Sequence, residues 1–278
     1  MPVVTGLFTY PVKSCRGISL EAADLDVRGF RHDRRWMVVD AAGQFVSQRA
    51  HPALARIVPR LTSDGLELAV DGGSERLSVP ASRWGEGPSV SVTVWKYGGT
   101  AIDQGDEAAT FFSAFLGTPV RFVRMPEAEV RVPNRLPDGV RAQVGFADGY
   151  PLLLASEASL AELNRHLPEG EAPIPMDRFR PNVVVAGCAG PWEEERWNRF
   201  VIGGVPFHGV KPCERCAIPR VDQRTGVPAG KEPSRTLARI HRDGKAALFG
   251  ANLVHGGLGT IRVGQRVREI IFGPRPAV

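Results

Sequence analysis

The sequence predicts an α+β fold in which β-structure dominates, and three observations point to it. Glycine (31 residues) and proline (23 residues) make up about a fifth of the 278-residue chain, which favours many turns over long helices. Short apolar or alternating segments recur between the turns, as strands do. Only a few stretches have helical spacing. Many short strands joined by tight turns indicate a barrel or a strongly curved sheet.

Composition excludes several classes of protein. Apolar residues make up 43% and charged residues 23%, which excludes a disordered, collagen-like or coiled-coil chain. A net charge of +5 on this length does not indicate nucleic-acid binding. No window approaches the ~18–20 apolar residues of a membrane span, and the start lacks a signal peptide. Four cysteines are too few for a disulfide scaffold. We therefore expect a reducing, cytoplasmic setting.

The first third of the chain reads as strands. Residues 35–40 and 44–49 flank a short turn and predict a hairpin closed at Gly43. Residues 66–70 form another apolar run. Residues 90–96 alternate valine with polar or aromatic residues, which is typical of a half-buried strand.

Three segments have helical features. Residues 107–116 follow Asp106, a capping residue type, and carry an apolar face. Residues 157–167 follow Ser156 with leucines at helical spacing, and a proline ends them. Residues 233–241 form a weaker candidate.

The segment 127–151 is rich in proline, glycine and charge, and is the best candidate for a linker or a substrate-facing loop. We divide the chain near residue 130 into domains over 1–130 and 131–272, followed by a short tail, 273–278. In the second domain the acidic run Glu193–Glu195 is expected to face solvent. The expected strands there are 152–155, 183–186, 200–202, 205–210, 217–221, 260–263 and 267–272.

The pair Cys213 and Cys216 lies in the densest group of chemistry-bearing residues, and several interpretations compete. A structural zinc site usually takes four ligands, but Cys15 and Cys188 are isolated in the sequence. A thioredoxin-like dithiol needs a βαβ setting that is missing here. The pair is also compatible with two buried structural thiols.

Cationic neighbours favour a further interpretation. Lys211, Arg215 and Arg220 surround the pair. Cations lower the pKa of a thiol and favour the thiolate, which is the form that binds soft metals. A thiolate beside an arginine suits a soft metal carried on an anionic cofactor.

Three other segments place cations at strand ends. The loop after Tyr10 holds Lys13, Ser14 and Arg16, residue types that donate hydrogen bonds and charge to phosphate. The segments 32–36 and 177–182 place arginines at strand mouths, where guanidinium groups gather at one end of a barrel. Cations in loops often face only water, so their position in the fold decides whether they bind an anion.

The segments occur in an order that resembles one family over residues 3–272. They read YPVKSCRG, DRRWMVVD with a following SQR, SEASLAELN, RFRPNVVV, PCERCAIPRVDQRTG, KEPSRTL and LFGAN. Together they resemble proteins with a molybdenum cofactor sulfurase C-terminal (MOSC) domain preceded by an N-terminal β-barrel domain, above all the amidoxime-reducing components and their bacterial homologues. The resemblance implies a MOSC-type β-barrel with flanking helices and a cofactor between the two domains.

The resemblance also implies site residues for a molybdenum cofactor (Mo-molybdopterin). Cys216 matches the cysteine that ligates molybdenum and is the expected catalytic residue, and Cys213 then does not ligate the metal. Lys13 and Ser14 match a pair that contacts the anionic end of the cofactor. The other matching cofactor-binding residues are Arg34, Arg180, Asn182, Arg215 and Asn252.

The implied activity is an oxidoreductase that removes oxygen from N-hydroxylated small molecules, such as amidoximes and N-hydroxylated bases. Arg131, Arg135 or Arg141 would shape substrate access. Gly149 and Tyr150 stand where eukaryotic members have small hydroxyl residues, so those contacts are not expected. The chain has no plant-type ferredoxin domain, so electrons would come from a separate ferredoxin, flavodoxin or cytochrome b5-like protein with its reductase.

Two other functions stay open. Cys216 would carry a persulfide or present the cofactor to a partner if the chain is a sulfur-transfer protein or a cofactor carrier. No pyridoxal-dependent sulfurase domain is recognised in the chain, so we expect no pyridoxal phosphate. A thiol-based binding protein without metal is the third possibility.

Overall fold

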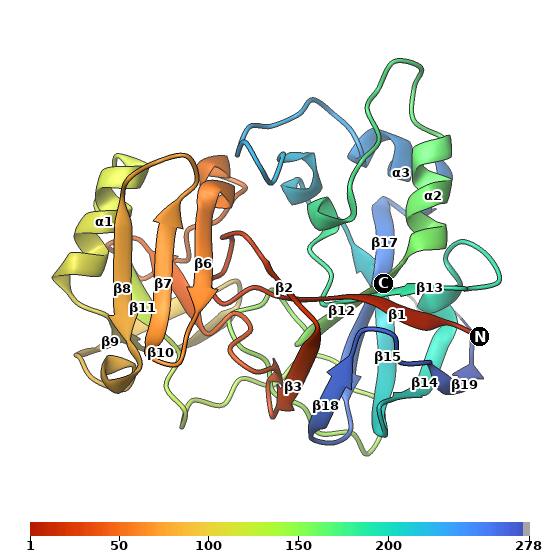
Figure 1. The fold of residues 1–278 in the computed structure, drawn as a ribbon, viewed down its shortest axis with the longest axis horizontal. Coiled ribbons are helices and arrows are strands. Elements are labelled where there is room, and N and C mark those ends of the chain that lie inside the picture. The colour runs from red at the N-terminus through yellow and green to blue at the C-terminus, as the bar shows by residue number, and fades with distance from the viewer. Residues whose placement is uncertain (275–278) are drawn as a thin grey trace.

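The computed structural model describes residues 1–274, so most of the expected tail, 273–278, lies outside the described residues. The described chain is α+β and mostly β, which confirms the predicted fold class. Figure 1 shows two parts side by side, the N-terminal strands with their helix and the larger C-terminal sheet with the other two helices. The part of the chain that the structure describes contains three α-helices, α1 (Asp106–Leu116), α2 (Glu157–Arg165) and α3 (Ser234–Ile240).

The largest sheet has nine strands and curls into a half-barrel. Within residues 1–274, β12 and β13 are the only neighbours in this sheet that pair in parallel, and the other pairings are antiparallel. The N-terminal strand β1 lies inside this sheet, which ties the start of the chain to its C-terminal half. In order, the strands are β19 (Arg268–Phe272), β14 (Trp197–Ile202), β15 (Val205–Glu214), β17 (Ala246–His255), β12 (Leu152–Ser156), β13 (Val183–Ala186), β1 (Val3–Thr9) and β2 (Ile18–Leu20), with β16 (Arg242–Asp243) beside β17.

Three smaller sheets complete the β-structure. Strands β18 and β3 pair residues from the two ends of the chain, so the two parts are joined a second time. Buried Trp36, Phe112 and Phe122 lie in the core of the N-terminal part, against which α1 packs. The sheets contain β5 (Trp36–Val39), β11 (Arg121–Arg124), β10 (Tyr97–Asp103) and β9 (Ser89–Val94); β6 (Ile57–Leu61), β7 (Gly65–Val70) and β8 (Arg76–Pro80); and β18 (Gly259–Arg262), β3 (Ala22–Asp26) and β4 (Gly29–Phe30).

Most expected strands are confirmed, but the hairpin over 35–40 and 44–49 is wrong in part. The turn forms at Gly43, whose φ of +75° favours glycine. Strand β5, however, pairs with β11, and Phe45 makes only an isolated bridge to Val39. The main partner of β5, β11, lies more than 80 residues away along the chain. A local turn pattern therefore cannot predict this pairing.

The expected strand over 217–221 is also wrong. These residues form a short 3-10 helix, η5 (Ile218–Arg220). Pro219 has no N–H to donate to a neighbouring strand, so an apolar run that contains it is a poor strand.

The helix predictions are confirmed apart from one cap. Ser156 caps α2, because its Oγ accepts a hydrogen bond from the Ser159 N–H at 3.1 Å. Asp106 does not cap α1. It is the first helical residue, Gly105 occupies the cap position, and the Asp106 carboxylate pairs with Arg121 at 2.8 Å.

The acidic run Glu193–Glu195 does not face solvent as expected. Its residues begin the 3-10 helix η4 (Glu193–Arg196), and Glu194 and Glu195 are buried. The Glu194 carboxylate accepts hydrogen bonds from the Ser156 and Ser159 hydroxyls at 2.9 and 2.8 Å. Burial raises the pKa of Glu194 to about 7. This run of charges is therefore an internal connection between η4 and the start of α2.

The loop 127–151 is irregular, as expected, but buried arginines hold it in place. Arg28 Nη2 donates to the carbonyls of Glu127 and Glu129, both at 2.6 Å. Arg131 donates to the carbonyls of Gly145 and Asp148 at 2.8 and 2.9 Å. The loop carbonyls have no partners in a strand or helix, and these guanidinium groups supply their hydrogen bonds. The bonds therefore fix the conformation of the loop beside the junction of the two parts.

Candidate functional site

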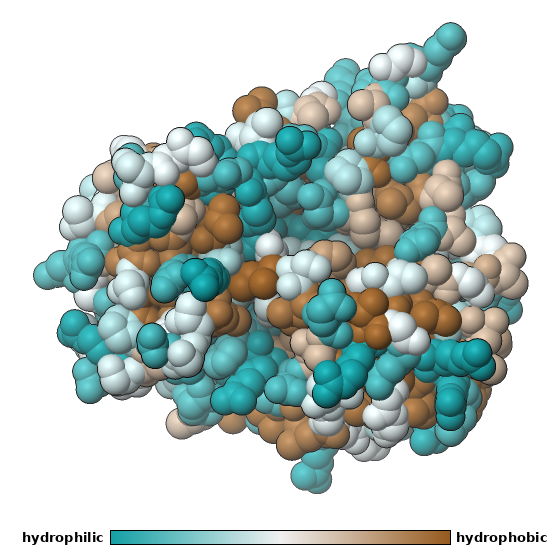
Figure 2. Space-filling model, viewed as in Figure 1, coloured by the Kyte–Doolittle hydropathy of each residue, from teal (hydrophilic) through white to brown (hydrophobic). Residues whose placement is uncertain are grey.

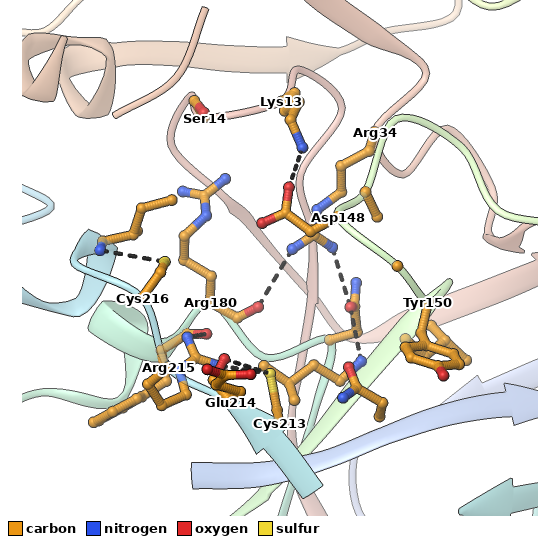
Figure 3. A pocket seen from close by; sticks show the side chains of 18 of the residues that line it. Lys13, Ser14, Arg34, Asp148, Tyr150, Arg180, Cys213, Glu214, Arg215 and Cys216 are labelled. Carbon is orange, nitrogen blue, oxygen red and sulfur yellow. Dashed lines mark hydrogen bonds and ion pairs between the residues drawn. The ribbon is translucent and has the colours of Figure 1, made fainter. Parts of the chain in front are cut away.

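One pocket brings together all eight site residues expected from the sequence. Hydrophilic residues gather in the hollow between the two parts on the face drawn in Figure 2. Figure 3 shows the pocket from close by, with basic side chains and two sulfur atoms around it. The expected residues that line it are Lys13, Ser14, Arg34, Arg180, Asn182, Arg215, Cys216 and Asn252.

The pocket is built from strand ends and the loops that follow them. Lys13 and Ser14 follow β1, and Arg34 lies between β4 and β5. Arg215 and Cys216 follow β15, whose register with β17 places Lys211 opposite Asn252. Segments from the start, middle and end of the chain therefore meet at one place.

Three lining residues have left-handed backbone conformations. Ser14, Arg34 and Arg180 have φ values of 69°, 46° and 55°. Such values are uncommon for residues with a Cβ and are retained where surrounding contacts enforce them. Gln48 supplies one such contact by donating to the Ser14 carbonyl at 2.6 Å. The strain thus coincides with residues that place side chains in the pocket.

Arg34 and Asn182 are held together by a buried carboxylate. Arg34 Nη1 donates to Asp33 Oδ2 at 2.6 Å and to Asn182 Oδ1 at 3.1 Å. Asn182 Nδ2 donates to Asp33 Oδ1 at 3.1 Å. This network fixes the Arg34 side chain across the junction between the two parts.

A second carboxylate lies between two cations that line the pocket. Lys13 Nζ lies 2.5 Å from Asp148 Oδ1, and Arg49 Nη2 lies 2.8 Å from Asp148 Oδ2. Burial alone would raise the pKa of Asp148, but Lys13 and Arg49 hold it well below its usual range. Burial lowers the pKa of Lys13, and the charge of Asp148 opposes that effect.

Arg49 and Asp148 are the functional candidates that the sequence prediction missed. Arg49 ends the SQR segment, which was noted only as part of the family pattern. Asp148 lies in the loop that was expected to face substrate, but no motif marks it. Its position depends on Arg131, whose bonds to the loop carbonyls are set by the fold.

The two pocket cysteines have different surroundings. Cys216 Sγ accepts a weak hydrogen bond from the Ile218 N–H at 3.5 Å. Cys213 Sγ accepts from Arg215 Nη1 at 3.1 Å. Cys15 and Cys188 do not line the pocket, and burial raises the pKa of each to about 12. Within residues 1–274, no three His, Cys, Asp or Glu side chains are grouped as metal ligands would be.

The pocket carries more positive than negative charge. Five basic side chains line it against two acidic ones, Asp148 and Glu214. Arg180 is buried, and no carboxylate in the described chain lies within ion-pair distance of it. The Nε atom of Arg215 is buried without a hydrogen-bond partner there. Among the lining cations, Arg180 and Arg215 thus have no carboxylate within ion-pair distance in the described chain. A soft thiol beside such cations suits an anionic group that carries a soft metal, so the residues present fit the expected cofactor.

The three arginines expected to shape substrate access have separate positions. Arg131 does not line the pocket and instead binds the loop carbonyls. Arg135 lines an adjoining pocket with Lys211 and Asp148. Arg141 lines an apolar groove on another part of the surface.

No α-helix in the described part of the chain is both long enough and apolar enough to span a bilayer.

Comparison with known families and proteins agrees with this organisation. A model of the MOSC N-terminal beta barrel domain matches residues 1–119, and a model of the MOSC domain matches residues 141–268. Mitochondrial amidoxime-reducing component 1 of Homo sapiens is 34% identical over 285 residues, covering 95% of this chain and 82% of that protein. Mitochondrial amidoxime reducing component 2 of Bos taurus is 31% identical, covering 96% and 83%. A molybdenum cofactor sulfurase of Oryza sativa subsp. japonica is 30% identical, covering 88% of this chain but 31% of that protein.

Proposed function

Because this chain belongs to the two-domain MOSC family that includes the mitochondrial amidoxime-reducing components, we propose that it is a molybdenum-cofactor-dependent reductase. Its substrates are small N-hydroxylated compounds such as amidoximes and N-hydroxylated bases. The observation that carries the proposal is the meeting of Cys216 with basic side chains from distant segments in one pocket. We also propose that its domains span 1–130 and 131–272 and that it works in the cytoplasm.

The proposed roles follow from the chemistry of the lining residues. Cys216 supplies the thiolate ligand for the metal, which a soft metal prefers to nitrogen or oxygen. Lys13, Ser14, Arg34 and Arg180 hold the anionic part of the cofactor. Three more residues are proposed to bind the cofactor: Asn182, Arg215 and Asn252.

The cofactor, when bound, supplies the two-electron chemistry that converts an N-hydroxylated compound, two electrons and two protons into the reduced nitrogen compound and water. The protein residues bind and orient. Asp148 is held ionised by Lys13 and Arg49, so it accepts hydrogen bonds from an incoming N–OH or N–H group rather than donating a proton. The electrons come from a separate ferredoxin, flavodoxin or cytochrome b5-like protein with its reductase.

Activity of the loaded protein tests this proposal. Protein from a host that makes the cofactor is assayed with benzamidoxime and a reduced viologen dye. We expect Cys216→Ser to lower the rate at least about a hundredfold, since the metal loses its protein ligand. Cys188→Ser changes a thiol outside the pocket and serves as the matched control. A wild-type protein that holds molybdenum but does not reduce benzamidoxime or other N-hydroxylated compounds would contradict the proposal.

The match to a molybdenum cofactor sulfurase supports a second candidate, a sulfur-transfer or cofactor-carrier role for Cys216. A persulfide on Cys216 would release thiocyanate when treated with cyanide. Cyanide-labile sulfur that disappears in Cys216→Ser, together with no reductase turnover, would favour this role.

A further inference from the structure

Two guanidinium groups of the pocket lie over the ring of Tyr10. The Cζ atoms of Arg34 and Arg180 lie 4.1 and 4.3 Å from the ring centroid. Tyr10 itself is only 3% exposed and does not line the pocket. Its hydroxyl donates to the Pro181 carbonyl at 3.1 Å. Arg34 and Arg180, labelled in Figure 3, both have side chains at the pocket wall.

The two arginines repel each other and are not equally neutralised. Arg34 pairs with Asp33 at 2.6 Å. Arg180 has no carboxylate partner within residues 1–274, and its Nη1 donates only to Gln223 Oε1 at 3.2 Å. Burial, with a smaller effect from Arg34, lowers the pKa of Arg180 to about 10, so it remains protonated at neutral pH. No carboxylate contacts this second charge directly, although Asp33 attracts it from farther away, and the Tyr10 ring lies close enough to stabilise it.

The faces of an aromatic ring attract cations, and burial strengthens the attraction. A ring that two guanidinium groups both contact attracts each of them and so favours the positions that they occupy. Gly17 leaves the space for this ring, because a Cβ at position 17 would lie 2.5 Å from Tyr10 Cε1. The Tyr10 ring therefore packs directly against the backbone of Gly17, and this contact fixes the position of its edge.

We propose that Tyr10 is a positioning residue that holds Arg34 and Arg180 over its ring, so that both guanidinium groups are available to one multiply charged anion such as a phosphate group. The inference rests on the proposed function only in taking the ligand of the pocket to be anionic. Tyr10 acts through the arginines and does not touch the ligand.

Binding of inorganic phosphate to the cofactor-free protein, followed by ³¹P NMR titration, tests the proposal without molybdenum. Tyr10→Leu removes both ring faces and is expected to weaken phosphate binding about tenfold. Tyr10→Phe keeps the faces and loses only the hydroxyl, so its dissociation constant is expected to stay within about twofold of wild type. Gly17→Ala displaces the ring edge and is expected to weaken binding as well.

Replacement of Tyr10 by 3,4,5-trifluorophenylalanine keeps the ring shape but weakens the attraction of its faces for cations. The protein with this fluorinated ring should bind phosphate more weakly than Tyr10→Phe does. This comparison tests the role of the ring even if Tyr10→Leu does not fold. Trp84→Leu is the matched control, because Trp84 has Arg124 over its ring, 5.3 Å away, but lies outside the pocket, and its phosphate affinity should equal that of the wild type.

Three results would overturn the proposal: equal phosphate affinity in Tyr10→Leu and wild type, a loss in Tyr10→Phe as large as in Tyr10→Leu, or no phosphate binding by the wild type. Failure of the proposed reductase function is seen separately, as missing turnover in the loaded protein. The phosphate titration does not depend on that assay.

Discussion

Individual charged residues in this protein have environments that differ from what their sequence neighbours suggest. Asp148 is the clearest case at the pocket, because Lys13 and Arg49 both pair with one carboxylate that comes from an irregular loop. Glu194 is the opposite case, a carboxyl buried among hydroxyl groups with no cation paired to it in the described chain. Each leads to a measurable consequence.

Removal of the Asp148 charge should destabilise the protein. Asp148→Asn removes the negative charge that pairs with the buried Lys13 ammonium and leaves that ammonium with neutral acceptors, among them the Phe146 carbonyl at 2.8 Å. We expect the free energy of unfolding to fall by about 1 kcal/mol, a modest value because the Asp148 side chain is partly exposed. Urea unfolding at neutral pH measures the change. Asp138→Asn, at an exposed position of the same loop, is the control, and an equal loss in both variants would contradict the account.

Glu194 should make stability depend on pH. Its pKa is raised from the ordinary 4.5 to about 7, so the folded state holds the proton more tightly than the unfolded state. The free energy of unfolding therefore decreases as pH rises between these values, by up to about 3 kcal/mol. Glu194→Gln cannot ionise and should lack this decrease. Urea unfolding at pH 5, 6, 7 and 8 compares the two proteins, and parallel pH profiles would show that Glu194 is not the cause.

At the scale of elements, the loop 127–151 positions the site without regular secondary structure. Arg131 replaces strand pairing by donating to the carbonyls of Gly145, Ala147 and Asp148. These bonds fix the part of the loop that brings Asp148 to Lys13 and Arg49. The loop therefore contributes to the structure of the pocket, as the strand ends do.

Loss of Arg131 should loosen this loop selectively. In Arg131→Met we expect faster amide hydrogen exchange over residues 145–150 and a destabilisation of about 2 kcal/mol, since buried carbonyls lose their donors. Exchange in α2 should be unchanged. Hydrogen exchange with mass spectrometry makes the comparison, with the exposed Arg141→Met as control. Unaltered exchange over 145–150 would mean that other contacts hold the loop.

Elements whose signals are local were predictable from the sequence. The Ser156 cap and the apolar run within β7 depend on neighbouring residues, and the structure confirms both. The partner of β5 was not predictable, because β11 is distant in the chain. The burial of Glu194 and Glu195 was missed for the same reason, since their partners lie on other elements.

At the scale of the whole molecule, the family motifs identified the pocket residues but not how the fold gathers them. Strand β1 lies in the large sheet and β18 pairs with β3, so each end of the chain binds the other part. The pocket forms only where these crossings bring Lys13 and Arg34 to Cys216. Arg49 and Asp148 join them through contacts that no linear motif encodes.

The central claim is that this one pocket holds a single molybdopterin through Cys216 and the basic side chains around it. Molybdenum and pterin measured on the same sample, purified from a host that makes the cofactor, test it most directly. The account predicts about one of each per chain, with the metal lost in Cys216→Ser and the pterin reduced in Arg180→Met. A wild-type chain without either component, or Cys216→Ser with its full molybdenum content, would contradict it.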